Sequence, residues 1–186
     1  MKKIVLTGGP SGGKTTALSI LKETFGKKIA LVQEAATLIY SGGFPRTDNS
    51  PVHIVHAQKI IYYTVTQLEE LAEKTSDAKV MVCDRGTIDG AVYWPYGPED
   101  FFKNMHSSLE AELARYDAVI HLSPPPEKDY YQATNVRTEN LQQAFELDDK
   151  ILNIWAKHPN RLVVPRDKHY FEKAEIIKNF VENLIK

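Results

Sequence analysis

The sequence predicts an α/β fold: a three-layer sandwich in which a mainly parallel sheet of five strands lies between two layers of helices. Short apolar runs rich in β-branched residues alternate along the chain with longer segments of helical periodicity. This alternation implies βαβ units, whose right-handed crossovers give parallel strands with helices on both faces of the sheet. A chain of 186 residues with 42% hydrophobic content suits one domain, so residues 1–186 are expected to share one fold.

Each predicted strand is apolar at consecutive positions, which is typical of strands buried on both faces. The expected strands are residues 3–7, 28–33, 79–83, 118–122 and 161–164. The expected helices are residues 14–24, 34–39, 52–74, 99–115, 139–157 and 171–185. Residues 41–51 and 123–135 are irregular. Long loops in a compact domain often serve as lids or binding loops, although a solvent loop without a role is the alternative for both.

Composition excludes several classes of protein. The 23 basic and 24 acidic residues give a formal net charge of −1 with no block of like charge, so a nucleic-acid partner is not expected. The single cysteine, Cys83, cannot form an intramolecular disulfide, which favours a reducing compartment. The apolar run at residues 4–6 is too short for a signal peptide, and no later run could span a bilayer. A cytoplasmic location is therefore expected.

A glycine-rich segment follows the first predicted strand and opens the first helix. It matches the pattern G-x-x-x-x-G-K-[ST] in the required context, and it consists of Gly8, Gly9, Pro10, Ser11, Gly12, Gly13, Lys14 and Thr15, followed by Thr16. Glycines let backbone N–H groups turn toward phosphates, and the helix N-terminus attracts anionic oxygens. Lys14 is expected to reach the β- and γ-phosphates and Thr15 to ligate magnesium. The predicted cofactors are therefore Mg²⁺ and ATP, with GTP possible.

Two carboxylates follow predicted strands. In a parallel sheet, Asp84 and Glu34 should lie at the edge that carries the glycine-rich segment. Asp84 is expected to hold magnesium, directly or through water, and Glu34 to act as a general base or as an outer ligand of the metal's water. A turn cap at Asp84 and an acid in the first turn of a helix at Glu34 are the alternatives. Arg85 stands where motor ATPases usually have a glutamate, which favours transfer to an acceptor over hydrolysis.

The residues after the strand ends predict a pocket for that acceptor. Arg85 and Asp89 follow one strand, and Arg46 lies with Asp48 in the irregular segment at residues 41–51. Both segments should face the same cleft, where polar groups and aromatic rings could hold a ribose and a base. Arg46, Arg85 and Asp89 are therefore the predicted substrate-binding residues.

Other side chains near this pocket are less specific. Tyr93 and Trp94 could stack on a ligand, but large aromatic residues pack in the core at least as often. The histidines, including His53 and His56, have no partners at metal-ligand spacing beyond a single helical turn. We interpret the histidines as structural.

Five segments spread along nearly the whole chain form a specific set. They are residues 5–16, Gln33-Glu34-Ala35-Ala36, Cys83-Asp84-Arg85-Gly86 with Asp89, Val136-Arg137-Thr138-Glu139 and Glu146-Leu147-Asp148. As a set they resemble the NadR-type AAA domain family, whose founding member joins an adenylyltransferase domain to a kinase domain that phosphorylates nicotinamide riboside. This chain is similar to the second of those domains. The resemblance implies a kinase-like P-loop fold with the strand order 2-3-1-4-5, and it leaves the acceptor open.

The resemblance also implies a lid-like segment around residues 123–140. In kinases of similar fold, a lid carries arginines that close over the transferring phosphoryl group, and Arg137 matches that position. Such an arginine would neutralise the charge that develops on the γ-phosphoryl group. An ion pair between Arg137 and Glu139 is the alternative.

Two functions are consistent with these residues. The first is a kinase that transfers the γ-phosphoryl group of Mg-ATP to a small hydroxyl-bearing, nucleoside-like acceptor. The second is an ATP- or GTP-dependent switch or ATPase that acts through a protein partner. A kinase requires Glu34, Asp84 and a closed pocket, whereas a switch tolerates loss of Glu34. The sequence lacks the Asn-Lys-x-Asp motif of many guanine-specific proteins, so ATP is favoured.

Overall fold

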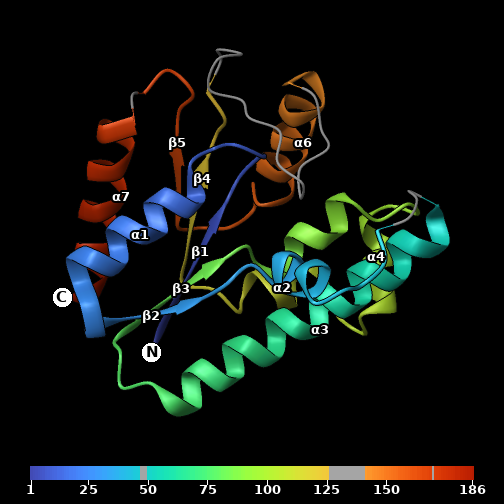
Figure 1. Ribbon diagram of the computed structural model, residues 1–186, viewed down its shortest axis with the longest axis horizontal. Coiled ribbons are helices and arrows are strands. Elements are labelled where there is room, and N and C mark those ends of the chain that lie inside the picture. Colours follow the sequence, from blue (N-terminus) through green and yellow to red (C-terminus); the bar gives the residue numbers. More distant parts are fainter. Residues whose placement is uncertain (47–49, 126–140, 169) are drawn as a thin grey trace.

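The computed structural model describes residues 1–46, 50–125, 141–168 and 170–186, which form an α/β sandwich (Figure 1). The strands are β1 (Lys2–Thr7), β2 (Ile29–Val32), β3 (Val80–Asp84), β4 (Ala118–Leu122) and β5 (Arg161–Val164). The α-helices are α1 (Lys14–Phe25), α2 (Ala35–Ser41), α3 (Pro51–Thr75), α4 (Pro98–Asn104), α5 (Leu109–Leu113), α6 (Leu141–Ile154) and α7 (Tyr170–Ile185). Two short 3₁₀ helices are η1 (Gly26–Lys28) and η2 (Thr87–Val92).

The five strands form one parallel sheet in the order β2-β3-β1-β4-β5, which confirms the predicted strand order. The central strand β1 is flanked by β3, where Leu6 lies opposite Asp84, and by β4, where Thr7 lies opposite His121. The carboxyl ends of these strands therefore meet at one edge of the sheet. In open α/β sheets this edge is where ligands bind.

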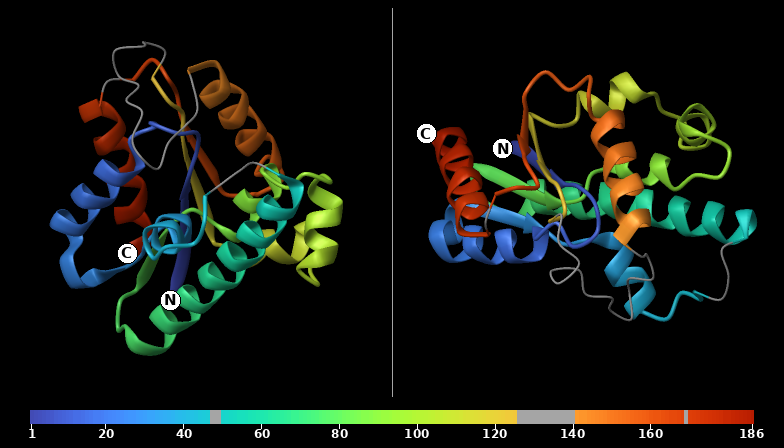
Figure 2. Two further views of the ribbon diagram at one scale, coloured as in Figure 1. Left: turned by 45° about the vertical axis from the view of Figure 1, so that its right-hand side comes forward. Right: turned by 90° about the horizontal axis from the view of Figure 1, so that it is seen from above.

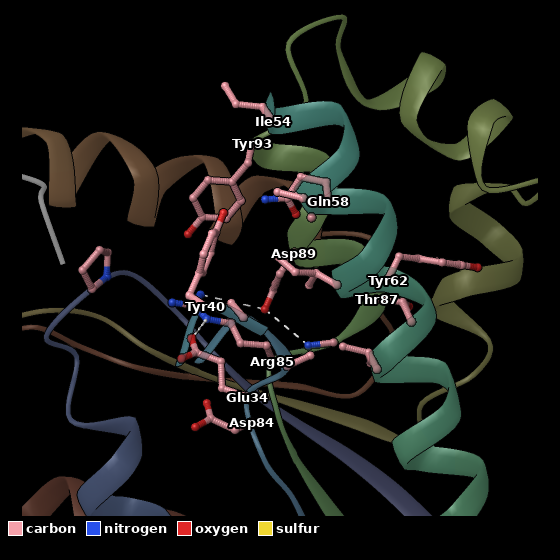
Figure 3. A pocket seen from close by; sticks show the side chains of 18 of the residues that line it. Glu34, Tyr40, Ile54, Gln58, Tyr62, Asp84, Arg85, Thr87, Asp89 and Tyr93 are labelled. Carbon is pink, nitrogen blue, oxygen red and sulfur yellow. Dashed lines mark hydrogen bonds and ion pairs between the residues drawn. The ribbon is translucent and has the colours of Figure 1, made fainter. Parts of the chain in front are cut away.

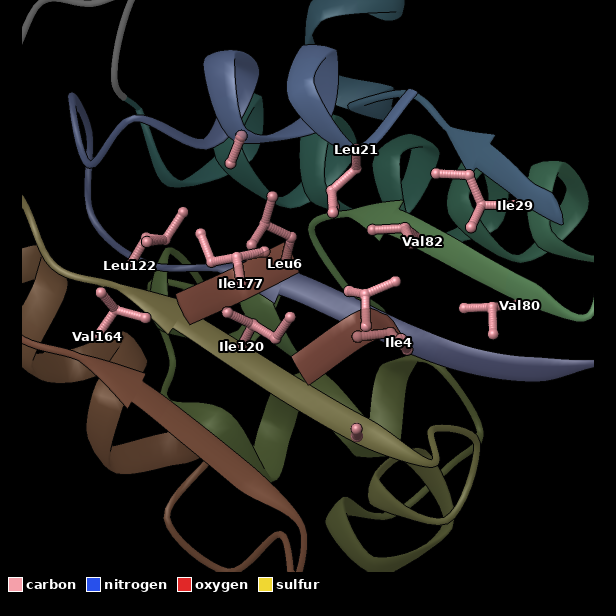
Figure 4. Packing of buried hydrophobic residues seen from close by; sticks show 13 residues of the cluster. Ile4, Leu6, Leu21, Ile29, Val80, Val82, Ile120, Leu122, Val164 and Ile177 are labelled. Atoms are coloured by element: carbon pink, nitrogen blue, oxygen red, sulfur yellow. The ribbon is translucent and has the colours of Figure 1, made fainter. Parts of the chain in front are cut away.

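Side chains of each strand alternate between the two faces of the sheet, so each face has its own apolar core. Ile4 points to the face covered by α1 and α7, where it shares a buried cluster with Ile177 (Figure 4). Val5 points to the opposite face and shares a cluster with Phe101 of α4 and Trp155 after α6. Figures 1 and 2 show the resulting two layers of helices, with α3 and α6 on the side away from α1 and α7.

Helix α3 carries part of the site and has a well-defined start. The Ser50 hydroxyl accepts a hydrogen bond from the His53 N–H at 3.3 Å, and Pro51 occupies the first turn. Both features favour the beginning of a helix. The helix runs for 25 residues and turns Ala57, Gln58 and other buried side chains toward the interior.

Helices α4 and α5 replace the single helix predicted over residues 99–115. The chain breaks between them because His106 has a left-handed backbone, with φ of 53°. The Ser108 hydroxyl then accepts a hydrogen bond from the Ala111 N–H at 3.2 Å and caps α5. Serine side chains that bond nearby backbone groups compete with a continuous helix. The helical periodicity of residues 99–115 therefore predicted one long helix where the chain forms two short ones.

Cys83 lies near the end of β3 in the middle of the sheet and is fully buried. Burial raises the pKa of its thiol. Among the residues that the structure describes, no helix combines the length and the apolar character that crossing a membrane requires.

Candidate active site

The glycine-rich loop joins β1 to α1 and lies against the end of β4. Gly8 has φ of 124°, and a Cβ atom there would lie 2.1 Å from the carbonyl oxygen of Leu122, so this position requires glycine. Gly13, with φ of 89°, is the N-cap of α1 and offers no side chain to the N–H groups of the first turn. These N–H groups and the helix dipole make the N-terminus of α1 suited to phosphate oxygens.

Lys14 is buried and lies over the loop. Its Nζ donates hydrogen bonds to the carbonyl oxygens of Gly8 at 3.0 Å and Gly9 at 2.8 Å. Phosphate oxygens form stronger, charge-assisted bonds with an ammonium group than neutral carbonyls do. Thr15, the next residue, is exposed at the start of the helix, where its hydroxyl is accessible to a ligand.

Asp84 ends β3 at the same edge of the sheet. Its Oδ1 atom is buried and has no hydrogen-bond partner within the described part of the chain. Burial and the neighbouring Glu34 carboxylate raise the pKa of Asp84 to about 6. A carboxylate with these properties is suited to a divalent cation, which would supply both a partner and positive charge.

Glu34 is the N-cap residue of α2 and lies beside Asp84 in Figure 3. Its carboxylate accepts hydrogen bonds from Arg85 Nε at 3.3 Å and from the Thr37 hydroxyl. Burial alone would raise the pKa of Glu34, but the charge of Arg85, the Thr37 hydrogen bond and the charge of Lys14 hold it below its usual value. Glu34 is therefore ionised at neutral pH and able to accept a proton.

Arg85 and Asp89 connect the turn after β3 to the rest of the site. Arg85 has a left-handed backbone, with φ of 76°, and its Nη1 atom lies 2.8 Å from the Gly8 carbonyl oxygen and 3.9 Å from Asp89 Oδ2. The buried Asp89 carboxylate accepts hydrogen bonds from the Thr7 hydroxyl at 2.8 Å and from Trp155 Nε1 at 2.7 Å. Asp89 is thus bonded within the protein and helps to hold Arg85.

A cavity of about 480 Å³ begins at the loop and extends between α2, α3 and η2. Lys14, Thr15 and Asp84 line it at the loop. Figure 3 shows Glu34 and Arg85 above Asp84, between it and the part of the cavity lined by α3 and η2. Groups suited to phosphate and metal therefore lie at one end of the cavity. The part between α2, α3 and η2 is called the second compartment below.

That compartment is lined by aromatic and amide side chains. Tyr40 comes from α2, Tyr93 follows η2, and Gln58 projects from α3 toward Tyr93 (Figure 3). Gln58 is 9% exposed, and its amide makes no hydrogen bond within the residues that the structure describes. An amide that faces the cavity offers a donor and an acceptor to a ligand.

Tyr62 and Thr87 form another part of the cavity wall, and a carboxylate behind them fixes their hydroxyls. Glu112 of α5 accepts hydrogen bonds from the Tyr62 hydroxyl at 2.6 Å and the Thr87 hydroxyl at 2.6 Å. It also accepts one from the Ser107 hydroxyl at 2.5 Å. Glu112 is buried, so these bonds are shielded from water.

The structure brings most of the predicted site residues around this cavity. The predicted site residues that line the cavity are Pro10, Lys14, Thr15, Glu34, Arg46, Asp84, Arg85 and Asp89. Arg46 is exposed, and its guanidinium lies 4.9 Å from the centre of the Tyr40 ring. The predicted residues Asp48 and Arg137 lie outside the described residues, so the lid role of Arg137 stays a prediction.

Of the less specific side chains, Trp94 packs in the core and His53 faces the cavity. Trp94 is buried and donates from Nε1 to Asp100 at 2.7 Å. His53 lines the cavity, with its ring centre 5.5 Å from that of Phe44. No group of three or more His, Cys, Asp or Glu residues with metal-binding geometry occurs in the described ranges.

Sequence analysis did not identify Gln58 as a site residue, although a signal was present. Ile54, Ile61 and Val65 follow helical spacing on α3 and also line the cavity. Gln58 interrupts this apolar stripe with a polar side chain. A polar residue in the apolar stripe of a long helix is a reason to suspect a ligand contact.

The loop after β1, the acid at the end of β3 and the strand order together define a P-loop fold of the kinase-like class. The model of the AAA domain family matches residues 3–173, and the chain belongs to this family. No curated protein matches the sequence.

The fold is similar to that of a solved nucleoside kinase. The structure of deoxyadenosine kinase from M. mycoides with bound dATP superposes with a TM-score of 0.63 at 13% sequence identity. The superposition covers 98% of this chain and 100% of that chain. At this identity the similarity establishes a shared fold.

Proposed function

We propose that the protein is a kinase that transfers the γ-phosphoryl group of Mg-ATP to a hydroxyl group of a small nucleoside-like acceptor. The observation that carries this proposal is the continuity of the cavity. It begins at Lys14, Thr15 and Asp84, passes Glu34, and continues between α2, α3 and η2. A triphosphate on the loop and an acceptor in the second compartment would meet beside a carboxylate.

The residues at the loop fit magnesium. Asp84 Oδ1 is buried without a partner among the described residues, and the Thr15 hydroxyl is accessible at the start of α1. These two oxygens would hold Mg²⁺, with phosphate oxygens and water completing its shell. When bound, the ion neutralises charge on the β- and γ-phosphates. The Lys14 ammonium group would leave the carbonyl oxygens of the loop and bond to the same phosphates.

Glu34 is the proposed general base. In the transfer, the acceptor oxygen forms a bond to the γ-phosphorus, the bond from that phosphorus to the ADP oxygen breaks, and the hydroxyl proton passes to Glu34. The lowered pKa of Glu34 keeps it in the form that accepts a proton. Its contact with Arg85 holds the carboxylate at the junction of the two compartments.

The second compartment favours a planar group with hydrogen-bonding edges. Tyr40 and Tyr93 provide aromatic rings, and the free amide of Gln58 provides a donor and an acceptor. A nucleoside has such a group and also the hydroxyl that a kinase needs. The NadR-type resemblance suggests nicotinamide riboside as one acceptor to test, and the fold similarity suggests deoxyadenosine as another.

A screen of nucleosides for acceptor-dependent ADP release tests the proposal. We expect release from Mg-ATP to depend on one class of acceptor, and Glu34→Gln to bind Mg-ATP but to lose transfer by about 10²-fold or more. The alternative, a nucleotide-dependent switch, predicts that ADP release does not depend on an acceptor and is not changed by Glu34→Gln. Glu23→Gln, an exposed carboxylate on α1, is the control.

A further inference from the structure

A buried cluster at the phosphate loop has no role in the transfer proposed above. Its centre is Asp148 of α6, which is fully buried. Its Oδ1 accepts a hydrogen bond from the Gly9 N–H at 2.7 Å and lies 2.9 Å from His121 Nε2, while Oδ2 accepts one from Arg166 at 3.1 Å. One carboxylate therefore joins the loop after β1, the strand β4 and the segment after β5. Figure 1 shows the loop after β1 reaching α6.

The peptide between Gly8 and Gly9 is held through both of its polar groups. Its carbonyl oxygen accepts hydrogen bonds from Lys14 at 3.0 Å and Arg85 at 2.8 Å, and its N–H donates to Asp148. The carbonyl and N–H of a trans peptide point in opposite directions, so these partners fix the plane of the peptide. Because glycines flank it, the backbone alone would leave that plane free to rotate.

The cluster is arranged for an ionised carboxylate. Burial would raise the pKa of Asp148, but bonds from His121, the Gly9 N–H and Arg166 hold it below its usual value. The loop also packs closely on α6, since a Cβ atom on Gly9 would lie 2.8 Å from Asp148 Cβ and 3.0 Å from the Ala144 carbonyl oxygen. The loop and the helix therefore have one tight arrangement.

We infer that Asp148 is a positioning residue for phosphate binding, which it serves by fixing the Gly8–Gly9 peptide of the loop. The inference rests on the proposed function, because that function assigns this loop to ATP. Binding would draw Lys14 from the loop carbonyls to the phosphates, which leaves Arg85 and Asp148 to hold the peptide. Without Asp148 the loop also populates orientations that do not bind phosphate. The apparent affinity for Mg-ATP then falls in proportion to the fraction of the protein whose loop can bind.

Two variants test the role, Asp148→Ala and the nearly isosteric Asp148→Asn. Asp149→Asn is the matched control, because Asp149 is exposed, adjacent and paired with the same Arg166 at 2.9 Å. Calorimetry gives the affinity for Mg-ATP, and ¹H–¹⁵N spectra give the chemical shift of the Gly9 amide. A proton bonded to a carboxylate resonates far downfield, a signature that general stability does not change.

We expect the downfield Gly9 signal to be lost in Asp148→Ala and the affinity for Mg-ATP to fall by about tenfold or more in both variants. The Asp149→Asn variant should keep the signal and the affinity. If both Asp148 variants bind Mg-ATP like the parent, the inference is wrong and the proposed function stands. If the parent itself does not bind Mg-ATP, the proposed function fails first. Failure of both variants to fold would assign Asp148 to the core and overturn the inference.

Discussion

Arg85 Nε lies 3.3 Å from Glu34 Oε1, and this contact joins the turn after β3 to the residues that follow the adjacent strand β2. The same guanidinium reaches the Gly8 carbonyl oxygen at 2.8 Å. One side chain therefore sets the distance between the proposed base and the phosphate loop. It does so from a left-handed backbone, a conformation that costs about 1–3 kcal/mol outside glycine and that persists at sites where it is held by its surroundings.

Lys14→Ala and Thr15→Ala should abolish productive binding of Mg-ATP without unfolding the protein. The Lys14 ammonium group bonds the carbonyl oxygens of Gly8 and Gly9, and Thr15 is exposed, so neither side chain belongs to the apolar core. Calorimetric titration measures the affinity, and thermal melting checks the fold. Ser19→Ala, at an exposed position on the same helix, is the control. Unchanged affinity in both variants would remove the basis for assigning this loop to a nucleotide.

Asp84→Asn should stabilise the magnesium-free protein at alkaline pH. The pKa of Asp84 is about 6 when folded, above its usual value of 3.8, so the charged form is disfavoured by folding. Above pH 6 the parent carries this cost and the variant does not, so the free energy of unfolding should rise by about 1–3 kcal/mol at pH 8. The difference should shrink as the pH falls toward 4 and vanish below about pH 3, where Asp84 is protonated in both states.

Urea unfolding at pH 4, 6 and 8 measures this difference, with the exposed Asp77→Asn as control. Adding Mg-ATP should reverse the order at pH 8, because the ion binds the carboxylate of the parent and stabilises its folded state. A difference that does not depend on pH would contradict a raised pKa at Asp84.

Gln58→Leu should separate binding of the acceptor from folding. The side chain is largely buried and its amide, which faces the cavity, has no hydrogen-bond partner among the described residues, so an apolar replacement should leave the free energy of unfolding unchanged or higher. The KM for the acceptor should rise by about 10- to 100-fold, with little change in the KM for ATP. Gln67→Leu, an exposed position on the same helix, is the control. A variant with the parental KM for every acceptor would exclude Gln58 from recognition.

Glu112→Gln should weaken both the fold and the wall of the cavity. An amide cannot accept all the hydrogen bonds that the carboxylate accepts from Tyr62, Thr87 and Ser107. Leaving one buried hydroxyl without an acceptor costs about 1–3 kcal/mol in the free energy of unfolding. Urea unfolding measures the loss, and Glu110→Gln, exposed on the same helix, should cost almost nothing. Equal stability of the two variants would show that Glu112 is not essential to this network.

The sheet and the phosphate loop could be predicted because their signals are local. The apolar run at β1 and the glycines after it determine both the strand and the turn, and burial on both faces implies parallel neighbours. The strand order followed from the family resemblance. The break before α5 could not be predicted from periodicity, because the left-handed His106 and the Ser108 cap interrupt an otherwise helical pattern.

The contacts of Asp148 and Gln58 could not be predicted either. The bond between Asp148 and Gly9 spans 139 positions, and nothing near either residue indicates it. Gln58 stood out only as a polar residue within an apolar stripe, and that pattern does not say what the side chain faces. Predicting the contacts of such residues requires knowing how the helices pack on the sheet, which a single sequence does not specify.

The burial of Cys83 makes the chain convenient for thiol chemistry. It is the only sulfhydryl among the 186 residues and is fully buried in β3, and the raised pKa of its thiol further slows alkylation of the native protein. The rate at which a maleimide or a disulfide reagent modifies the unaltered protein therefore reports the opening of the middle of the sheet. A cysteine introduced at an exposed position, such as Ser19, would accept a fluorophore while the native thiol stays protected. Changes in the surroundings of this label on ligand binding could then be followed without first removing the natural cysteine.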